Sequence, residues 1–285
     1  MKTQIQQARA EAWVVLAICL VVSVVACGPA GPPPPAPGTP EFNWLRAQEA
    51  YKAGDYDRAT DLLVEVAESS SELAGKAQPW ALVTSLGLAR AYMELADKLN
   101  EGADRNRKDP AAFRRVANEY KVKARTTAWQ YARVAYRFIN ANKDKEVTLG
   151  MTLPEATFDD PVQYKKLAVG QMIPEGEIVA MQREVVRREI LRAGAQAVNQ
   201  PKDPAKARAA FETGEAKIPG PVFLLAVANG LYDVGEMFGP KKLDQPHRLK
   251  DIYDSAEAAL ALIKDNKDAR ELMKKVAAAR KKMKV

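Results

Sequence analysis

Few side chains in this sequence have the type and spacing that acid–base or metal chemistry requires. His247 is the only histidine, so a metal site cannot use two histidines of one chain, and a Ser-His-Asp triad would depend on this residue. Asp159 and Asp160 are adjacent carboxylates, but their place before Pro161 is typical of a turn and a helix N-cap. There is no HExxH, CxxC, GxSxG or Walker glycine loop. We therefore predict a protein that is not an enzyme, with no catalytic residues, metal or cofactor.

The two cysteines, Cys19 and Cys27, lie in an N-terminal segment with the order of a secretory signal. A polar, basic start is followed by an uninterrupted apolar run from 13 to 26. At about 1.5 Å per residue this run is too short to span a bilayer comfortably, and it has the length of a signal-peptide core. We expect residues 1–26 to be a signal peptide.

The sequence V-V-A-C, which ends at Cys27, resembles the lipobox of bacterial lipoproteins. In that family the signal peptide is cut before the cysteine, which is then acylated, so the resemblance implies a palmitate-type lipid on Cys27. Val24 stands where leucine is commonest. Gly28 follows the cysteine, in place of the aspartate that tends to retain such proteins at the inner membrane. The resemblance therefore implies a periplasm-facing lipoprotein of the outer membrane, with the inner membrane as the alternative.

A proline-rich tract, residues 27–41, separates the cysteine from the rest of the chain. Proline lacks the backbone N–H and fixes φ, so we expect an extended spacer here. At about 3.1 Å per residue it would hold the domain up to roughly 40 Å from a membrane. The alternatives for Cys27 are a core thiol, which foldable sequence should follow, and an uncleaved anchor, which needs roughly 20 apolar residues.

The remaining residues, 42–285, have the composition of a helical domain. Aromatic residues make up 7% of the chain, alanine is plentiful and β-branched runs are few, and this mix favours helix over strand. The net charge is +7, but the chain has no basic stripe with interleaved aromatics of the kind that nucleic-acid-binding proteins show. We predict an all-α domain that does not bind nucleic acid.

Apolar residues at helical spacing flank the turn sequence KAGDYDRA near the start of this domain. Gly54 suits the left-handed position that ends a helix, and Asp55 is a natural N-cap for the next one. With small residues at Ala47 and Ala59, this helix–turn–helix resembles a tetratricopeptide repeat (TPR). The resemblance implies a solenoid of stacked antiparallel helix pairs with a concave binding face. A generic alanine-rich bundle is the alternative.

A second stretch, residues 192–220, matches the same pattern. Ala207, Phe211 and Gly214 match the second helix, and Pro219 matches the closing proline. Further helices with looser matches, including a final basic amphipathic helix that would cap the array, are expected at 82–99, 111–141, 222–238, 247–263 and 267–284.

Residues 142–177 break the helical periodicity with several prolines and glycines. We expect one long irregular insert here, with a short helix at 160–168 that uses Asp160 as its N-cap. The insert is too apolar for a disordered segment, so it should pack on the helices. Whether it closes a groove or fills one stays open.

Four residues are candidates for partner binding, because aromatic side chains and arginine dominate binding energy when they are exposed in a patch. They are Trp44, Tyr51, Arg90 and Tyr92. The alternative for Tyr51 and Tyr92 is a place in the core.

These features predict a lipid-anchored, non-catalytic scaffold of the cell envelope that binds a protein or peptide partner through a helical-repeat groove. One alternative is a small-molecule-binding accessory subunit similar to the T-component of TRAP-type transporters, a helical-repeat lipoprotein of similar length. Another is a structural envelope protein that binds peptidoglycan.

Overall fold

The computed structural model describes residues 35–141 and 145–283, and this part of the chain is mostly helical. The expectation of an all-α fold is confirmed, with one short pair of strands as an addition. The expected signal peptide and Cys27 lie outside the described residues. The following elements appear in chain order: α2 (Pro40–Lys52), α3 (Tyr56–Glu68), α4 (Ala74–Arg105), α5 (Pro110–Ala141), β1 (Val147–Leu149), α6 (Tyr164–Ala168), α7 (Glu175–Ala197), α8 (Pro204–Ala209), β2 (Ala216–Ile218), α9 (Gly220–Phe238), η1 (Pro246–Arg248), α10 (Leu249–Ala261) and α11 (Lys267–Met283).

The first helix pair forms where its turn residues predict it. Gly54 has φ +77°, a conformation open to glycine, and ends α2. The Asp55 carboxylate accepts a hydrogen bond of 3.3 Å from the Arg58 amide and so caps α3. Helix α2 begins at Pro40, inside the last two residues of the expected spacer, because the Thr39 hydroxyl caps it and proline fits the first helical position.

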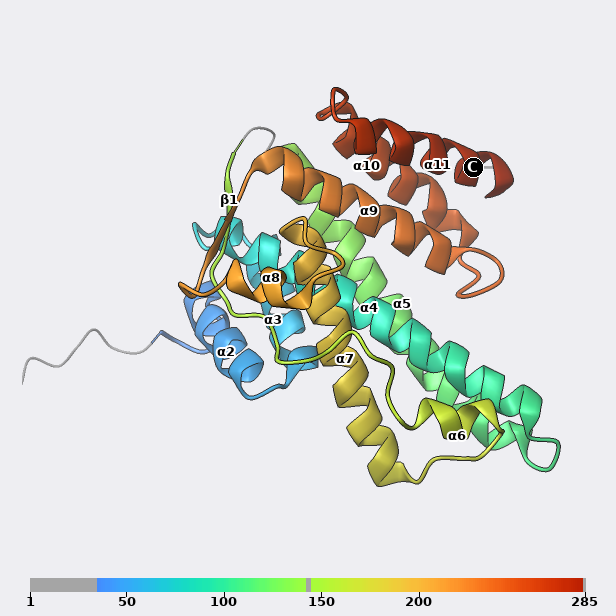
Figure 1. Cartoon of the computed structure of the whole chain (residues 1–285). Helices are drawn as coiled ribbons and strands as arrows, with labels where there is room; N and C mark the ends of the chain where they lie inside the picture. Colours follow the sequence, from blue (N-terminus) through green and yellow to red (C-terminus); the bar gives the residue numbers. More distant parts are fainter. Residues whose placement is uncertain (1–34, 142–144, 284–285) are drawn as a thin grey trace, which may run out of the picture.

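A long antiparallel hairpin of α4 and α5 lies at the centre of the molecule (Figure 1). Helix α4 continues through the polar residues after 99, where an interruption was expected, because exposed polar side chains do not break a helix. The turn comes at Asn106, whose side-chain oxygen accepts hydrogen bonds from the amides of Lys108 and Asp109 at 2.9 and 2.8 Å.

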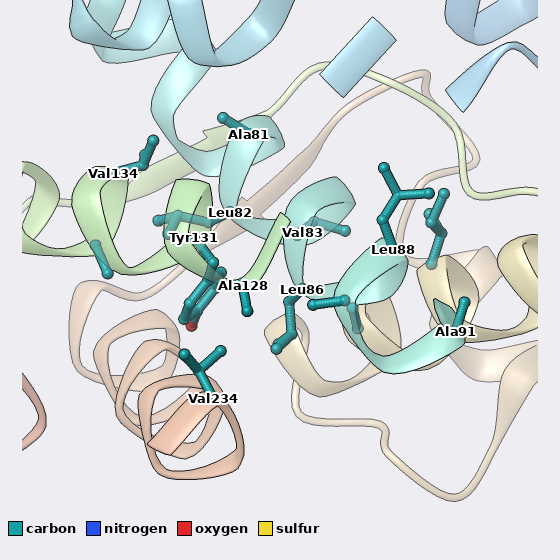
Figure 2. Close-up of a cluster of buried hydrophobic side chains, with 14 of the residues drawn as sticks. Ala81, Leu82, Val83, Leu86, Leu88, Ala91, Ala128, Tyr131, Val134 and Val234 are labelled. Atoms are coloured by element: carbon teal, nitrogen blue, oxygen red, sulfur yellow. The ribbon is translucent and has the colours of Figure 1, made fainter. Parts of the chain in front are cut away.

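Helix α4 packs against α3, α5, α6, α7 and α9. Figure 2 shows side chains of α4, α5 and α9 meeting in one apolar cluster, with Tyr131 pointing from α5 toward Val234 on α9. The Tyr131 hydroxyl donates a hydrogen bond of 2.9 Å to the Val227 carbonyl, which satisfies its polar atom inside the core. The buried apolar residues of the described chain form a single cluster.

The second repeat-like stretch folds only partly as expected. Asp203 caps α8 and Pro204 occupies its first turn, but the helix ends at Ala209. Phe211 therefore lies in a turn instead of a helix, where it is buried near Trp80, with ring centroids 6.3 Å apart. Strand β2 follows, and it pairs antiparallel with β1 from the insert.

The insert packs on the helices, as expected, and residues 150–163 form a strap across them. The Thr152 carbonyl accepts a hydrogen bond of 2.9 Å from the Tyr51 hydroxyl, and the Phe158 carbonyl accepts one of 2.7 Å from Arg192. The expected N-cap is wrong: α6 begins after Gln163, and Asp160 accepts a hydrogen bond of 2.8 Å from Arg188. Arginine side chains thus hold the strap by its polar backbone.

The C-terminal helices α9, α10 and α11 pack together beside the central hairpin (Figure 1). Helix α9 contacts both α4 and α5, and α10 contacts α5 as well as α9. Helix α11 lies mainly against α10 and α9. The contact between α5 and α10 brings together segments more than a hundred residues apart in the sequence, and it forms one wall of the site described next.

Candidate partner-binding groove

Two of the predicted partner-binding residues belong to the core. Tyr51 is 6% exposed and lies under the strap, where it donates its hydrogen bond to the Thr152 carbonyl. Tyr92 is 1% exposed and donates a hydrogen bond to the Asp57 carboxylate. Burial and the charge of Asp57 raise the pKa of the Tyr92 phenol far above its ordinary value. Neither ring lies on an exposed surface patch.

The other two predicted residues also hold the fold together. Arg90 of α4 forms an ion pair with Asp233 of α9 and donates a hydrogen bond of 2.8 Å to Gln196 of α7. It therefore ties three helices to one another. Trp44 of α2 is partly buried against the apolar core. The four candidates do not form one site in the structure.

A large hollow lies elsewhere, as an open-sided groove between α5 and α10 with a volume of about 730 Å³. The end of α3 reaches it through Glu68. Its apolar lining includes Trp129, Ile139 and Ile252. A concave site of this size with an apolar lining and a few polar groups is the usual form of a binding site.

Helix α5 has two faces, and the groove uses the one that the core does not. The positions 129, 133, 136 and 140 follow a spacing of three and four residues and line the groove as one stripe. The positions 128, 131, 135 and 138 form the buried stripe of the same helix. A long amphipathic helix therefore presents a second, partly apolar face to the groove.

Two aromatic side chains stand out on this face. Tyr136 is 62% exposed, which is unusual for a large ring on a helix packed into a core. Trp129 is partly buried, and the Arg248 guanidinium lies 3.8 Å from its ring centroid. This cation–π contact holds the indole at the edge of the groove and links the start of α10 to α5.

Charged residues of opposite sign line the two helices. On α5, Arg133 forms an ion pair of 3.3 Å with Glu68, and Arg137 donates a hydrogen bond of 3.0 Å to the Glu68 carbonyl. On α10, Asp251 is exposed and forms no ion pair among the described residues, and Asp254 is half-buried.

Neighbouring cations stabilise the ionised form of the Asp254 carboxyl. Hydrogen bonds and charge from Lys250 and Arg280 lower the pKa of its carboxyl below the ordinary value. Asp254 is therefore ionised in the neutral pH range, and its charge is paired with these two cations.

The residues considered for acid–base and metal chemistry can be placed within residues 35–141 and 145–283. No group of three or more histidine, cysteine, aspartate or glutamate side chains is placed there to hold a metal ion. His247 is exposed in η1. Asp160, one of the two adjacent carboxylates, is committed to Arg188 at 2.8 Å.

The sequence contains a signal for the groove. Trp129 and Tyr136 are seven residues apart, and both fall out of phase with the buried stripe of the same helix. Two large rings off the core stripe, beside Arg133 and Arg137, mark the face of the helix that lines the groove. The partner helix α10 could not have been named from the sequence, because the contact joins distant segments.

Comparisons of this chain with known protein families, with curated proteins and with solved structures found no match. In the part of the chain that the structure describes, none of the helices is both long enough and apolar enough to cross a membrane.

Proposed function

We propose that this protein is a non-catalytic scaffold that binds a partner protein in the groove between α5 and α10. One observation carries the proposal: the groove combines an exposed Tyr136 and an accessible edge of Trp129 with arginines of α5. Tyrosine, tryptophan and arginine are the residues that most often dominate protein–protein binding energy. An open side and charged walls also suit a polypeptide better than a small apolar ligand, which favours enclosure.

We further propose that the helix pairs form a TPR-like solenoid. The glycine turn and aspartate cap between α2 and α3 support this, as does the Asp203 cap of α8. Successive antiparallel hairpins with a terminal amphipathic helix are the general form of such arrays. In this proposal the partner binds on the α5–α10 side, because the strap covers Tyr51 on the other side of the array.

The proposed place of action is the cell envelope, with Cys27 acylated and the domain facing the periplasm, at the outer membrane. The lipobox-like V-V-A-C sequence and the proline tract after it support this proposal. Acyl chains on one residue would anchor the chain stably, since each buried methylene adds about 0.8 kcal/mol.

A photo-crosslinking experiment in cells tests the groove. A photoreactive amino acid replaces Tyr136 in the full-length chain, and a second variant carries it at Val122. Val122 is 52% exposed on the same helix and does not line the groove. We expect a specific protein adduct from position 136 and not from 122, and we expect Trp129→Ala to remove it. Identical adducts from both positions, or an adduct that survives Trp129→Ala, would contradict the proposal.

A further inference from the structure

The two walls of the groove differ in charge. Arg133 and Arg137 project from α5, while Asp251 and Asp254 line the α10 side. The arginines are exposed, and Arg137 is held by a backbone carbonyl and not by a carboxylate. Asp251 is exposed as well. Arg133 is paired with Glu68, and Asp254 is paired with Lys250 and Arg280. Among the described residues, a ligand lying along the groove therefore meets an unpaired positive charge at Arg137 on one edge and an unpaired negative charge at Asp251 on the other.

The walls are also helices over their whole length. The α5 stripe runs from position 129 to 140, which is roughly 16 Å or three helical turns at about 1.5 Å per residue. Away from the last turn of α5 and the first turn of α10, the backbone N–H and C=O groups of these walls are bonded within the helices. An extended peptide would find no free strand edge here, so its backbone groups could bond only to water or to side chains of the groove.

A helical ligand has no such difficulty, because its backbone is satisfied internally. Side-chain ridges of a third helix also fit between two packed helices, since all three follow the same spacing of three and four residues. Trp129 and Tyr136 then supply the apolar contacts for the side of the ligand that faces inward.

We infer that the groove binds one amphipathic α-helix of the partner protein, about three turns long. One edge of this helix is acidic and the other is basic. This inference rests on the proposed function and adds the class of ligand. The apolar stripe of the helix faces Trp129 and Tyr136. Carboxylates follow the stripe on the edge that faces α5, and lysine or arginine follows it on the edge that faces α10. Both edges are needed, because either wall repels a ligand edge of its own sign.

Three synthetic helical peptides test the inference by fluorescence anisotropy with the purified full-length chain. They share one apolar stripe and differ in their edges: one acidic and one basic, both acidic, or both basic. We expect the mixed-edge peptide to bind about tenfold more tightly than either of the others, which corresponds to a few exposed charge pairs. Three equal affinities, or no binding by the mixed-edge peptide, would overturn the inference.

Exchanging one wall charge should redirect the preference. Asp251→Lys makes both walls basic and should favour the both-acidic peptide, whereas Arg137→Glu should favour the both-basic one. Both positions are exposed, so the fold should persist, and circular dichroism checks this. If neither substitution changes the order of the affinities, the charges of the walls do not select the ligand.

A fourth peptide separates the ligand class from the function itself. It has the mixed-edge composition with two internal prolines, which prevent a helix. We expect it to bind at least tenfold more weakly than the mixed-edge helix. Equal binding would overturn the helical ligand while the crosslink at position 136 still supported the groove. If position 136 gave no specific crosslink, the proposed function itself would be contradicted.

Discussion

Arg188 is the charged side chain most completely enclosed by the fold, at 1% exposure. Its guanidinium pairs with Glu94 of α4, with Asp160 of the strap at 2.8 Å and with its neighbour Glu189 at 3.1 Å. It also donates a hydrogen bond of 3.2 Å to the Asp159 carbonyl. One buried residue thus joins α7, α4 and the strap, and all of its partners are acceptors.

Removing Arg188 should therefore be costly. In Arg188→Ala the carboxylate of Glu189, itself 4% exposed, loses a charge partner inside the protein. Glu189 keeps an ion pair of 2.6 Å with Arg192, so we expect the free energy of unfolding to fall by about 2–3 kcal/mol, measured by chemical denaturation. Arg183→Ala, on the same helix, is the control: Arg183 is exposed and forms no ion pair with another described residue, so the change should stay within about 0.5 kcal/mol. Equal effects would contradict the role given to Arg188.

Tyr120 gives a prediction about pH. Burial, with the negative charges of Glu119 and Asp57, raises the pKa of its phenol to about 12, whereas an unfolded tyrosine ionises near pH 10. The neutral phenol thus contributes to the free energy of unfolding, and this contribution is fully present below pH 10. That contribution is lost as the pH rises from about 10 to about 12, at about 1.4 kcal/mol per unit.

The matched variant is Tyr120→Phe. At neutral pH it should be less stable by about 1 kcal/mol, because the phenol donates a hydrogen bond of 3.1 Å to Gln182. At pH 12 the wild type has lost its advantage, so the phenylalanine variant should be the more stable protein. Denaturant unfolding at pH 8 and pH 12 measures both. A constant difference between the two proteins would show that the phenol is not held neutral.

At the scale of elements, local turn and cap signals predicted some helix ends, and distant contacts changed others. Gly54 and Asp55 predicted the turn between α2 and α3 because a left-handed glycine and a capping carboxylate act within a few residues. The early end of α8 followed from a contact that no local pattern contains. Phe211 leaves the helical stripe and packs near Trp80 of α4, and the chain then forms β2 against β1.

The close approach of α4 and α7 gives a prediction at this scale. A Cβ atom on Gly87 would come within 2.7 Å of the backbone of Ile190, which cannot move without separating the helices. Gly87→Ala should therefore destabilise the protein by about 1–3 kcal/mol, although alanine is the better helix former. Gly75→Ala on the same helix meets no atom within 4 Å and should not destabilise it. Thermal denaturation of both variants compares them; a stabilised Gly87→Ala protein would contradict the packing argument.

At the scale of the whole molecule, the candidate site depends on contacts that the sequence does not predict. The sequence shows which residues are aromatic but not which of them are exposed. Tyr51 is buried under the strap, which is about a hundred residues away in the sequence, and Tyr92 is buried as well. The groove itself needs α5 beside α10, and that contact depends on how α9 packs on the central hairpin. The sequence shows which positions of one helix share a face. It does not show which faces of distant helices pack together.

Attachment to the membrane is a property of the whole chain and can be measured directly. We expect wild type to fractionate with the outer membrane and to incorporate a radiolabelled fatty acid. Cys27→Ala should lose the label and much of the membrane association, because the acylated thiol is absent. A Cys27→Ala protein that stays fully membrane-bound would show that the lipobox reading is wrong. Cys19→Ala is the control, since the cut falls after it, and it should keep the label.

The order in which parts of the domain open should follow how many sides of each helix are covered. Helix α4 packs against α3, α5, α6, α7 and α9, so it can open only with the whole core. Helix α11 lies mainly against α9 and α10, and its outer face is highly charged.

Native-state hydrogen exchange should therefore show the slowest amides in the middle of α4 and α5, at the level of global unfolding, with exchange in α11 faster by several orders of magnitude. Mass spectrometry of peptic fragments measures both in one sample. Equal protection of α11 and α4 would mean that the C-terminal helix belongs to the same cooperative unit as the central hairpin. In that case α9 and α11 would both hold α10 in place, and the α5–α10 groove would be rigid. With a less protected α11, the α10 wall could move when a helix binds.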